Sequence, residues 1–236
     1  MLKRLIAAAA LAGAVSGMLL TALQQIEIVP LIRAAEAREV ASMPHTATAA
    51  HADQAWAPRD SAERLVATTV ANIILATAFA LLLGAAMSLR RQFGWRAGVA
   101  WGIAGYAAFF VAPALGLAPE LPGTGAAPLA DRQVWWIGAA GCSATGLWLA
   151  AFARKALPRI LGVALLIAPH AVGAPLPAVD ASAGEEARAF IRASYVANAA
   201  LWLVLGVLVG WLVKPGESPG AAGRHRSSGI DTRPPR

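Results

Sequence analysis

Long runs of apolar residues alternate with short polar segments along most of the chain. The runs cover roughly residues 5–23, 65–89, 97–117, 133–153, 159–173 and 193–213. A helix rises about 1.5 Å per residue, so roughly 20 apolar residues are enough to cross the ~30 Å hydrocarbon core of a bilayer. The pattern therefore predicts an all-α, polytopic protein with about six transmembrane helices, which together form one domain over residues 1–213.

Two of these runs leave alternatives open. The run at 159–173 is the shortest and contains Pro169, which removes a backbone N–H donor, so it either crosses fully or enters and returns on the same side. The first run follows Lys3 and Arg4 and is longer than the apolar core of a secretory signal. We interpret it as a retained span, with cleavage near Ala37 as the alternative.

The composition favours the membrane class. Of the 236 residues, 58% are hydrophobic and only 14% are charged, whereas a soluble domain carries about 25% charged residues. The single cysteine, Cys142, lies inside an apolar run, which excludes an intramolecular disulfide framework and indicates a packing role.

The charges between the runs predict the orientation. One set of segments is purely basic up to residue 214, and it comprises Lys3, Arg4, Arg90, Arg91, Arg96, Arg154, Lys155, Arg159 and Lys214. The alternate segments, 33–64, 118–132 and 174–192, mix acids with arginines. Because Lys and Arg are in excess on the cytoplasmic side, we expect both termini inside and these three loops outside.

The net charge of +7 comes from these short clusters, so we expect a lipid bilayer as the surroundings and no nucleic-acid partner. Residues 214–236 have the composition of a disordered basic tail, which this topology places in the cytoplasm.

Polar side chains gather at the predicted outer ends of the runs. The candidate metal ligands are His170, Glu120, His45, His51 and Asp53, and the candidate pore-lining residues are Gln24, Gln25, Glu27, Asn72 and Asn198. Imidazole nitrogen combined with carboxylate oxygen suits divalent cobalt, nickel or zinc. We therefore interpret this side as an entrance for a divalent cation.

Each candidate also has a purely structural interpretation. His45 and His51 lie six residues apart in a loop, where such a pair arises easily by chance. Glu120, between two prolines, fits a solvated turn, and His170 fits a ring that bonds a carbonyl freed by a neighbouring proline. Asn72 and Asn198 fit interhelical hydrogen bonds better than they fit metal ligation.

Three pairs of glycines have the GxxxG spacing that lets helix backbones approach closely. They are Gly13/Gly17, Gly98/Gly102 and Gly206/Gly210. The spacing fits tight packing within one chain and a homo-oligomer equally well. The chain also lacks a G-x-x-x-x-G-K-[ST] loop and the H-E-x-x-H, C-x-x-C and G-x-S-x-G motifs, so we predict neither an enzyme nor a permanently bound cofactor.

Several stretches resemble a known family. "LTALQQIEIVPLI" after the first run, "APELPG" (118–123) and "APHAVGAP" (168–175) resemble the CbtA family of predicted bacterial cobalt-transporter subunits, over about residues 1–213. The resemblance implies Co²⁺ as substrate, a role in uptake linked to cobalamin supply, and an inner-membrane location. It also implies a small partner, CbtB, with one span and a histidine motif.

The same resemblance assigns roles to individual residues. The outer-loop histidines of the family match His45 and His51, its Pro-Glu turn matches Glu120, and its Pro-His matches His170. This loop is sparse in histidine, which shifts the expected ion binding toward Glu120 and His170. The alternative function is a structural or assembly membrane protein that transports nothing itself.

Overall fold

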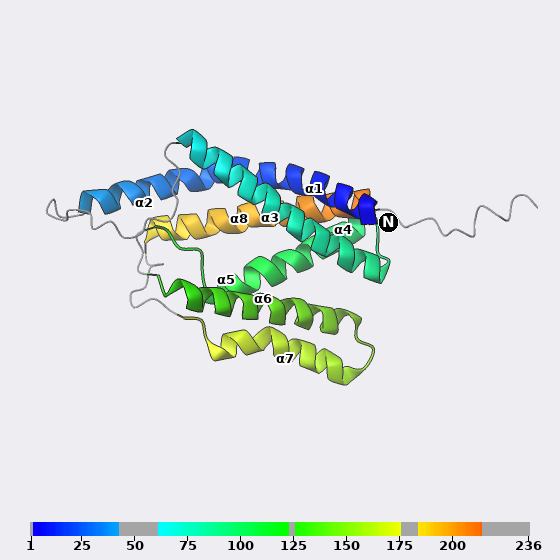
Figure 1. Ribbon diagram of the computed structural model, residues 1–236. Helices are drawn as coiled ribbons and strands as arrows, with labels where there is room; N and C mark the ends of the chain where they lie inside the picture. Colours follow the sequence, from blue (N-terminus) through cyan, green and yellow to red (C-terminus); the bar gives the residue numbers. More distant parts are fainter. Residues whose placement is uncertain (1, 43–60, 123–125, 176–183, 214–236) are drawn as a thin grey trace, which may run out of the picture.

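The computed structural model describes residues 2–42, 61–122, 126–175 and 184–213, and the regular structure of these residues is entirely helical. The elements are α1 (Leu2–Leu23), η1 (Gln24–Ile28), α2 (Val29–Ser42), α3 (Ser61–Arg90), α4 (Trp95–Tyr106), η2 (Ala107–Val111), α5 (Ala112–Gly116), α6 (Leu129–Phe152), α7 (Ala156–Val172) and α8 (Glu185–Leu212), where η marks a π-helical segment. The long helices run side by side and antiparallel in Figure 1. Among the described residues, five helical stretches are long and apolar enough to cross a membrane, and α7 is a shorter apolar helix. The chain is an all-helical, polytopic membrane protein.

The core lies where α1, α3, α4 and α8 meet. Trp202 on α8 is 1% exposed, and its ring lies against Phe79 of α3 and Phe109 of η2, with centroids 4.6 and 5.7 Å away. On the other side of the core, a Cβ added to Gly17 of α1 would lie 2.7 Å from the backbone of Ile73 on α3. Small residues thus let the backbones approach, and a few large rings fill the centre.

The GxxxG glycines of α4 and α8 pack against each other. A Cβ on Gly98 would lie 2.2 Å from the carbonyl oxygen of Gly206, and one on Gly206 would lie 2.3 Å from that of Gly98. The Gly94 N–H also donates to the Gly210 carbonyl at 2.8 Å. Both glycine pairs are therefore used inside the chain, as is Gly13/Gly17 against α3.

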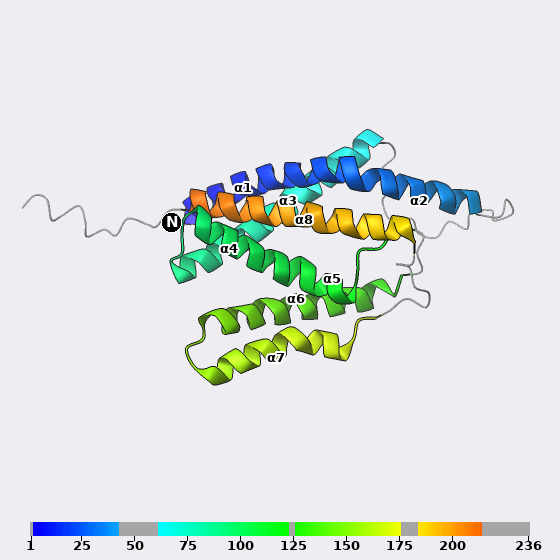
Figure 2. The same cartoon turned by 180° about the vertical axis from the view of Figure 1, so that it is seen from behind.

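Helices α6 and α7 form a hairpin beside this core. In Figure 2, α4 and α5 lie between this hairpin and the pair α1 and α8. Their backbones meet at Gly146 and Gly162, where an added Cβ would lie within 2.7 Å of the opposite carbonyl oxygen. Although α7 has only 17 residues, it extends about 26 Å at 1.5 Å per residue, close to the bilayer core. It runs alongside α6 in both views, so the short run is a regular apolar helix rather than an irregular loop, and its crossing of the membrane stays a prediction.

The first expected outer loop, 33–64, begins later than predicted, because the first helix continues through η1 and α2 to Ser42. Residues 33–42 are polar, yet they are mostly Ala, Glu and Arg, which are strong helix formers. Ion pairs hold this extension, since Arg38 pairs with Glu186 of α8 and Glu36 pairs with Arg64 of α3. The third expected loop, 174–192, is likewise shorter because α8 starts at Glu185.

Both π-helical segments lie just before a proline. The Val29 N–H bonds to the Gln24 carbonyl ahead of Pro30, and the Ala112 N–H bonds to the Ala107 carbonyl ahead of Pro113. Proline has no N–H, and its ring would clash with the carbonyl four residues earlier in a regular α-helix. The wider π turn accommodates the ring while the helix continues.

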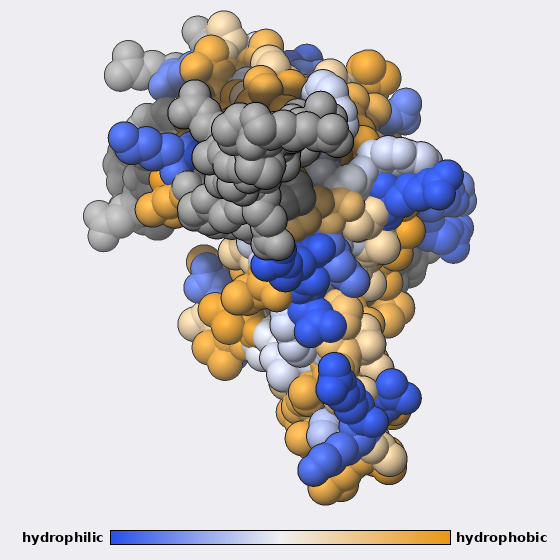
Figure 3. Space-filling model, turned by 90° about the vertical axis from the view of Figure 1, so that its right-hand side faces the viewer, coloured by the Kyte–Doolittle hydropathy of each residue, from blue (hydrophilic) through white to orange (hydrophobic). Residues whose placement is uncertain are grey.

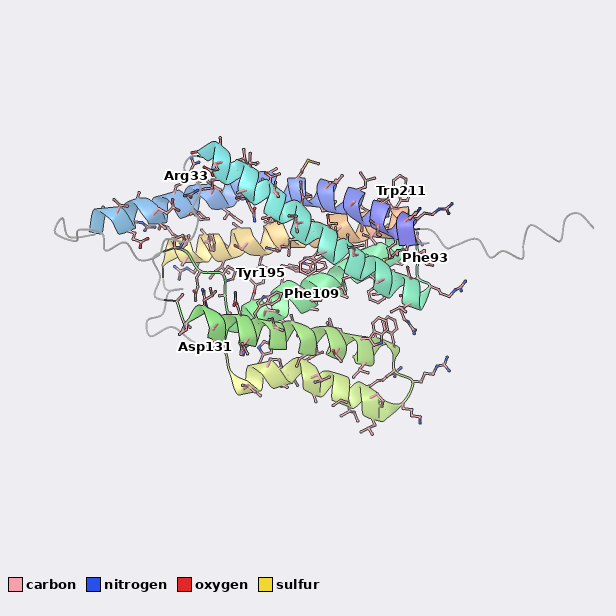
Figure 4. All side chains as sticks on the ribbon, viewed as in Figure 1. Arg33, Phe93, Phe109, Asp131, Tyr195 and Trp211 are labelled. Carbon is pink, nitrogen blue, oxygen red and sulfur yellow. The ribbon has the colours of Figure 1, made fainter. Side chains whose placement is uncertain are left out.

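The two ends of the bundle differ in charge. The basic end carries the clusters at Lys3–Arg4, 90–96 and 154–159, at the start of α1 and the turns α3–α4 and α6–α7. Figure 3 views this end, with hydrophilic groups separated by apolar surface. Figure 4 places Phe93 and Trp211 at this end and Asp131 at the opposite end, which we call the mixed-charge end.

Candidate functional site

Glu120 lies in the segment between α5 and α6, at the mixed-charge end. Its Oε2 accepts a hydrogen bond from Arg132 Nη1 at 3.2 Å, which joins this segment to the first turn of α6. The Glu120 side chain is 19% exposed and that of Arg132 is 33% exposed. The carboxylate is therefore withdrawn from bulk solvent and already has a cationic partner.

The pair forms part of the wall of an open surface cavity of about 660 Å³. The lining residues come from the end of α5 with the segment after it and from the first turns of α6, and they are Leu117, Ala118, Pro119, Glu120, Leu129, Arg132, Gln133, Trp136 and Ile137. Most of the wall is apolar, and its polar side-chain groups are one carboxylate, one guanidinium, one amide and one indole N–H. Such a cavity can admit a small ion that still carries water.

His170 occupies the last turn of α7 and is half-buried. Its ring meets the Trp135 ring edge to face, with centroids 6.0 Å apart. Trp135 also lies directly over Gly116 of α5, where a Cβ would be 2.2 Å from the indole. Trp135 thus fixes the end of α7 against the end of α5.

Arg132 and Trp135 are three residues apart on α6, so they lie on one helix face. One of them contacts Glu120 and the other contacts His170. Arg132 Nε and Trp135 Nε1 are both buried without a hydrogen-bond partner among the described residues. The first turns of α6 therefore contact both Glu120 and His170, although His170 is not among the residues that line the cavity.

The described residues do not contain a complete metal site. No three His, Cys, Asp or Glu side chains among them lie close enough together to hold an ion. Glu120 and His170 offer one oxygen and one nitrogen donor, while His45, His51 and Asp53 lie outside the described residues.

A second polar group lies between α1 and α3. Asn72 is 8% exposed, and its Nδ2 donates to Thr21 Oγ1 at 3.0 Å and to Gln24 Oε1 at 2.7 Å. Asn72 therefore makes the interhelical hydrogen bonds expected of a membrane asparagine.

The remaining pore-lining candidates have no hydrogen bond to this group among the described contacts. Asn198 donates to the Ser194 carbonyl of its own helix at 3.0 Å, so the expected bond between helices is absent from its described contacts. Gln25 is half-buried and Glu27 is exposed on η1.

The comparison with protein families decides the affiliation of the chain. A family model described as "Probable cobalt transporter subunit (CbtA)" matches residues 2–214. The chain belongs to the CbtA family. The match covers the α1–α3–α4–α8 core and the α6–α7 hairpin alike, so the CbtA unit includes every described helix. Comparison with curated proteins and with solved structures found no match.

The CbtA description is that of a transporter subunit and not of an enzyme. It places the cavity in a multi-pass protein for which cobalt is the expected substrate. Sequence reasoning did not find Arg132 or Trp135 as members of this site. A signal was present for Arg132, which is a basic residue close to Glu120 in a segment otherwise expected to face away from the basic side.

Proposed function

We propose that this CbtA-family chain is the membrane-spanning subunit of a Co²⁺ importer in the bacterial inner membrane, and that the ion enters at the mixed-charge end. The observation that carries the proposal is the position of Glu120. It is a mostly buried carboxylate in the wall of a 660 Å³ cavity, at the end opposite the basic clusters. Positive charge marks the cytoplasmic side, so this cavity faces outward.

The donors at this end suit a borderline divalent cation. Glu120 supplies carboxylate oxygen, His170 supplies imidazole nitrogen, and water or backbone carbonyls complete the coordination. The loop residues His45, His51 and Asp53 gather the ion loosely before it reaches the cavity. An incomplete set of protein ligands suits an entrance, because conduction needs binding weak enough to release the ion.

The membrane potential can drive the entry. Each elementary charge gains about 2.3 kcal/mol per 100 mV, so a divalent cation gains about 4.6 kcal/mol. Inward flux through this chain therefore needs no ATP site of its own. The polar residues Gln24, Gln25, Glu27, Asn72 and Asn198 are candidates for the path beyond the entrance, of which Gln24 and Asn72 are in contact.

A subunit implies partners. We place beside this chain a small single-span, histidine-containing CbtB-like protein that delivers the ion, and we assign the imported cobalt to cobalamin supply. The alternative of a pure assembly protein relied on free glycine faces. The three GxxxG pairs are filled by contacts within the chain, which favours transport over assembly.

Cobalt accumulation from low external Co²⁺ tests the proposal in cells that lack other cobalt importers and express the chain with its CbtB-like partner. We expect uptake by the wild type and at least a tenfold slower initial rate for Glu120→Gln and His170→Ala at matched membrane abundance. Glu185→Gln is the matched control, because Glu185 is an exposed carboxylate at the same end. Uptake by the wild type no higher than with an empty vector would refute import, and competition by Ni²⁺ or Zn²⁺ identifies the preferred metal.

A further inference from the structure

The carboxylate assigned to the ion is not free. Arg132 Nη1 bonds to Glu120 Oε2 at 3.2 Å, and this pair is more buried than the ion pairs at Glu36, Glu185 and Glu186. A divalent cation and a guanidinium cannot both lie against one carboxylate oxygen, because like charges repel strongly at such short range. Arg132 contacts only Oε2, so a cation can approach Oε1, but the nearby guanidinium repels it. Tight binding of an ion at Glu120 therefore competes with Arg132.

The pairing is also incomplete. The contact joins only Arg132 Nη1 to Glu120 Oε2, whereas a guanidinium can bind a carboxylate through two parallel hydrogen bonds. Arg132 Nε is buried and has no partner among the described residues. The guanidinium therefore makes fewer hydrogen bonds to the carboxylate than it could, which makes this contact easier to break.

The cavity offers room for the displaced side chain. Arg132 lines it together with Gln133 and Trp136. The Gln133 amide oxygen can accept a hydrogen bond, and an indole face attracts a guanidinium. Arg132 can therefore leave Glu120 and still keep a polar or aromatic partner.

We propose that Arg132 is an internal counter-cation that occupies Glu120 when no metal is bound, and that its displacement sets the affinity of the entrance for divalent cations. This inference rests on the proposed function. If the guanidinium occupies the carboxylate about nine-tenths of the time, the apparent dissociation constant is about tenfold weaker than that of a free Glu120. The pair thereby keeps the buried carboxylate neutralised between transport events and rejects weakly bound cations.

The test measures initial Co²⁺ uptake against external Co²⁺ concentration, with the full chain and its CbtB-like partner at matched membrane abundance. Arg132→Gln is expected to lower the half-saturating concentration about tenfold, and Glu120→Gln is expected to raise it. The double variant should match Glu120→Gln alone, because Arg132 acts only through that carboxylate. Arg188→Gln is the control, since it removes one positive charge from an exposed pair at the same end.

The possible failures are distinguishable. An unchanged or raised half-saturating concentration in Arg132→Gln, with Glu120→Gln impaired, would leave Co²⁺ import standing and overturn the counter-cation role. Wild-type behaviour of Glu120→Gln would remove the proposed entrance and this inference with it. If neither Arg132→Gln nor Arg132→Met accumulates in the membrane, Arg132 is required for folding and the proposal is also overturned.

Discussion

At the scale of single residues, one buried amide joins the first two long helices. Asn72 of α3 donates to both Thr21 and Gln24 across the interface, and Thr21 Oγ1 in turn donates to the Gly17 carbonyl at 3.0 Å. A polar side chain in this position must be paired, since no water is available in the hydrocarbon core. These linked hydrogen bonds of Asn72, Thr21 and Gly17 therefore fix the register of α1 against α3.

We expect Asn72→Ala to destabilise the protein by about 1–2 kcal/mol, because single interhelical hydrogen bonds in membranes contribute about 0.6 and at most about 1.7 kcal/mol. The thermal unfolding midpoint of the purified full chain in detergent is the measurement. Asn198→Ala is the control, since Asn198 bonds only within α8 among the described contacts. Equal shifts for the two variants would show that the interhelical bonds contribute nothing.

The sequence indicated some site residues and not others for a physical reason. Glu120 and His170 are unusual in themselves, since each is ionisable and flanks an apolar run beside a proline. Arg132 and Trp135 look ordinary for the start of a membrane helix, where arginine and tryptophan are common. Their importance comes from the approach of three chain segments, and the hydropathy pattern contains no information about that approach.

At the scale of helices, the apolar runs located the membrane segments but not their ends. The predicted run 5–23 agrees with α1, yet the helix continues to Ser42. Hydropathy detects residues that face lipid, whereas a polar helix outside the bilayer persists through propensity and ion pairs. The glycine spacing likewise predicted which helix faces pack closely, but it did not predict which helices those faces contact.

Gly206→Ala tests whether the glycine face is structural. Its Cβ would lie 2.3 Å from the Gly98 carbonyl oxygen, so α4 and α8 must separate, at a cost of about 1–3 kcal/mol. We expect a lower unfolding midpoint in detergent with no change in oligomeric state by size-exclusion chromatography with light scattering. Gly141→Ala on α6 is the control, because nothing lies within 4 Å of its added Cβ. A change of oligomeric state with an unaltered midpoint would instead make this face an interface between copies.

At the scale of the whole molecule, the cavity lies where two parts of the bundle join. The core of α1, α3, α4 and α8 is closed by glycine contacts and aromatic rings, while the α6–α7 hairpin joins it mainly through η2 and α5. Glu120 lies on the segment that connects these parts, and Trp135 and His170 belong to the hairpin. The proposed entrance therefore lies at the junction between the core and the hairpin, rather than inside the tightly packed core.

The direction of transport depends on which end faces outward, and cysteine labelling decides this. The single natural cysteine, Cys142, can be replaced by serine, after which Asp131→Cys reports on the mixed-charge end and Lys155→Cys on the basic end. Both positions are exposed. Because positive charge is retained in the cytoplasm, a membrane-impermeant maleimide should label Asp131→Cys in intact cells and label Lys155→Cys only after lysis. The reverse pattern would place the Glu120 cavity on the cytoplasmic side, where the membrane potential opposes departure of a divalent cation, and the chain would then require an energy source for export.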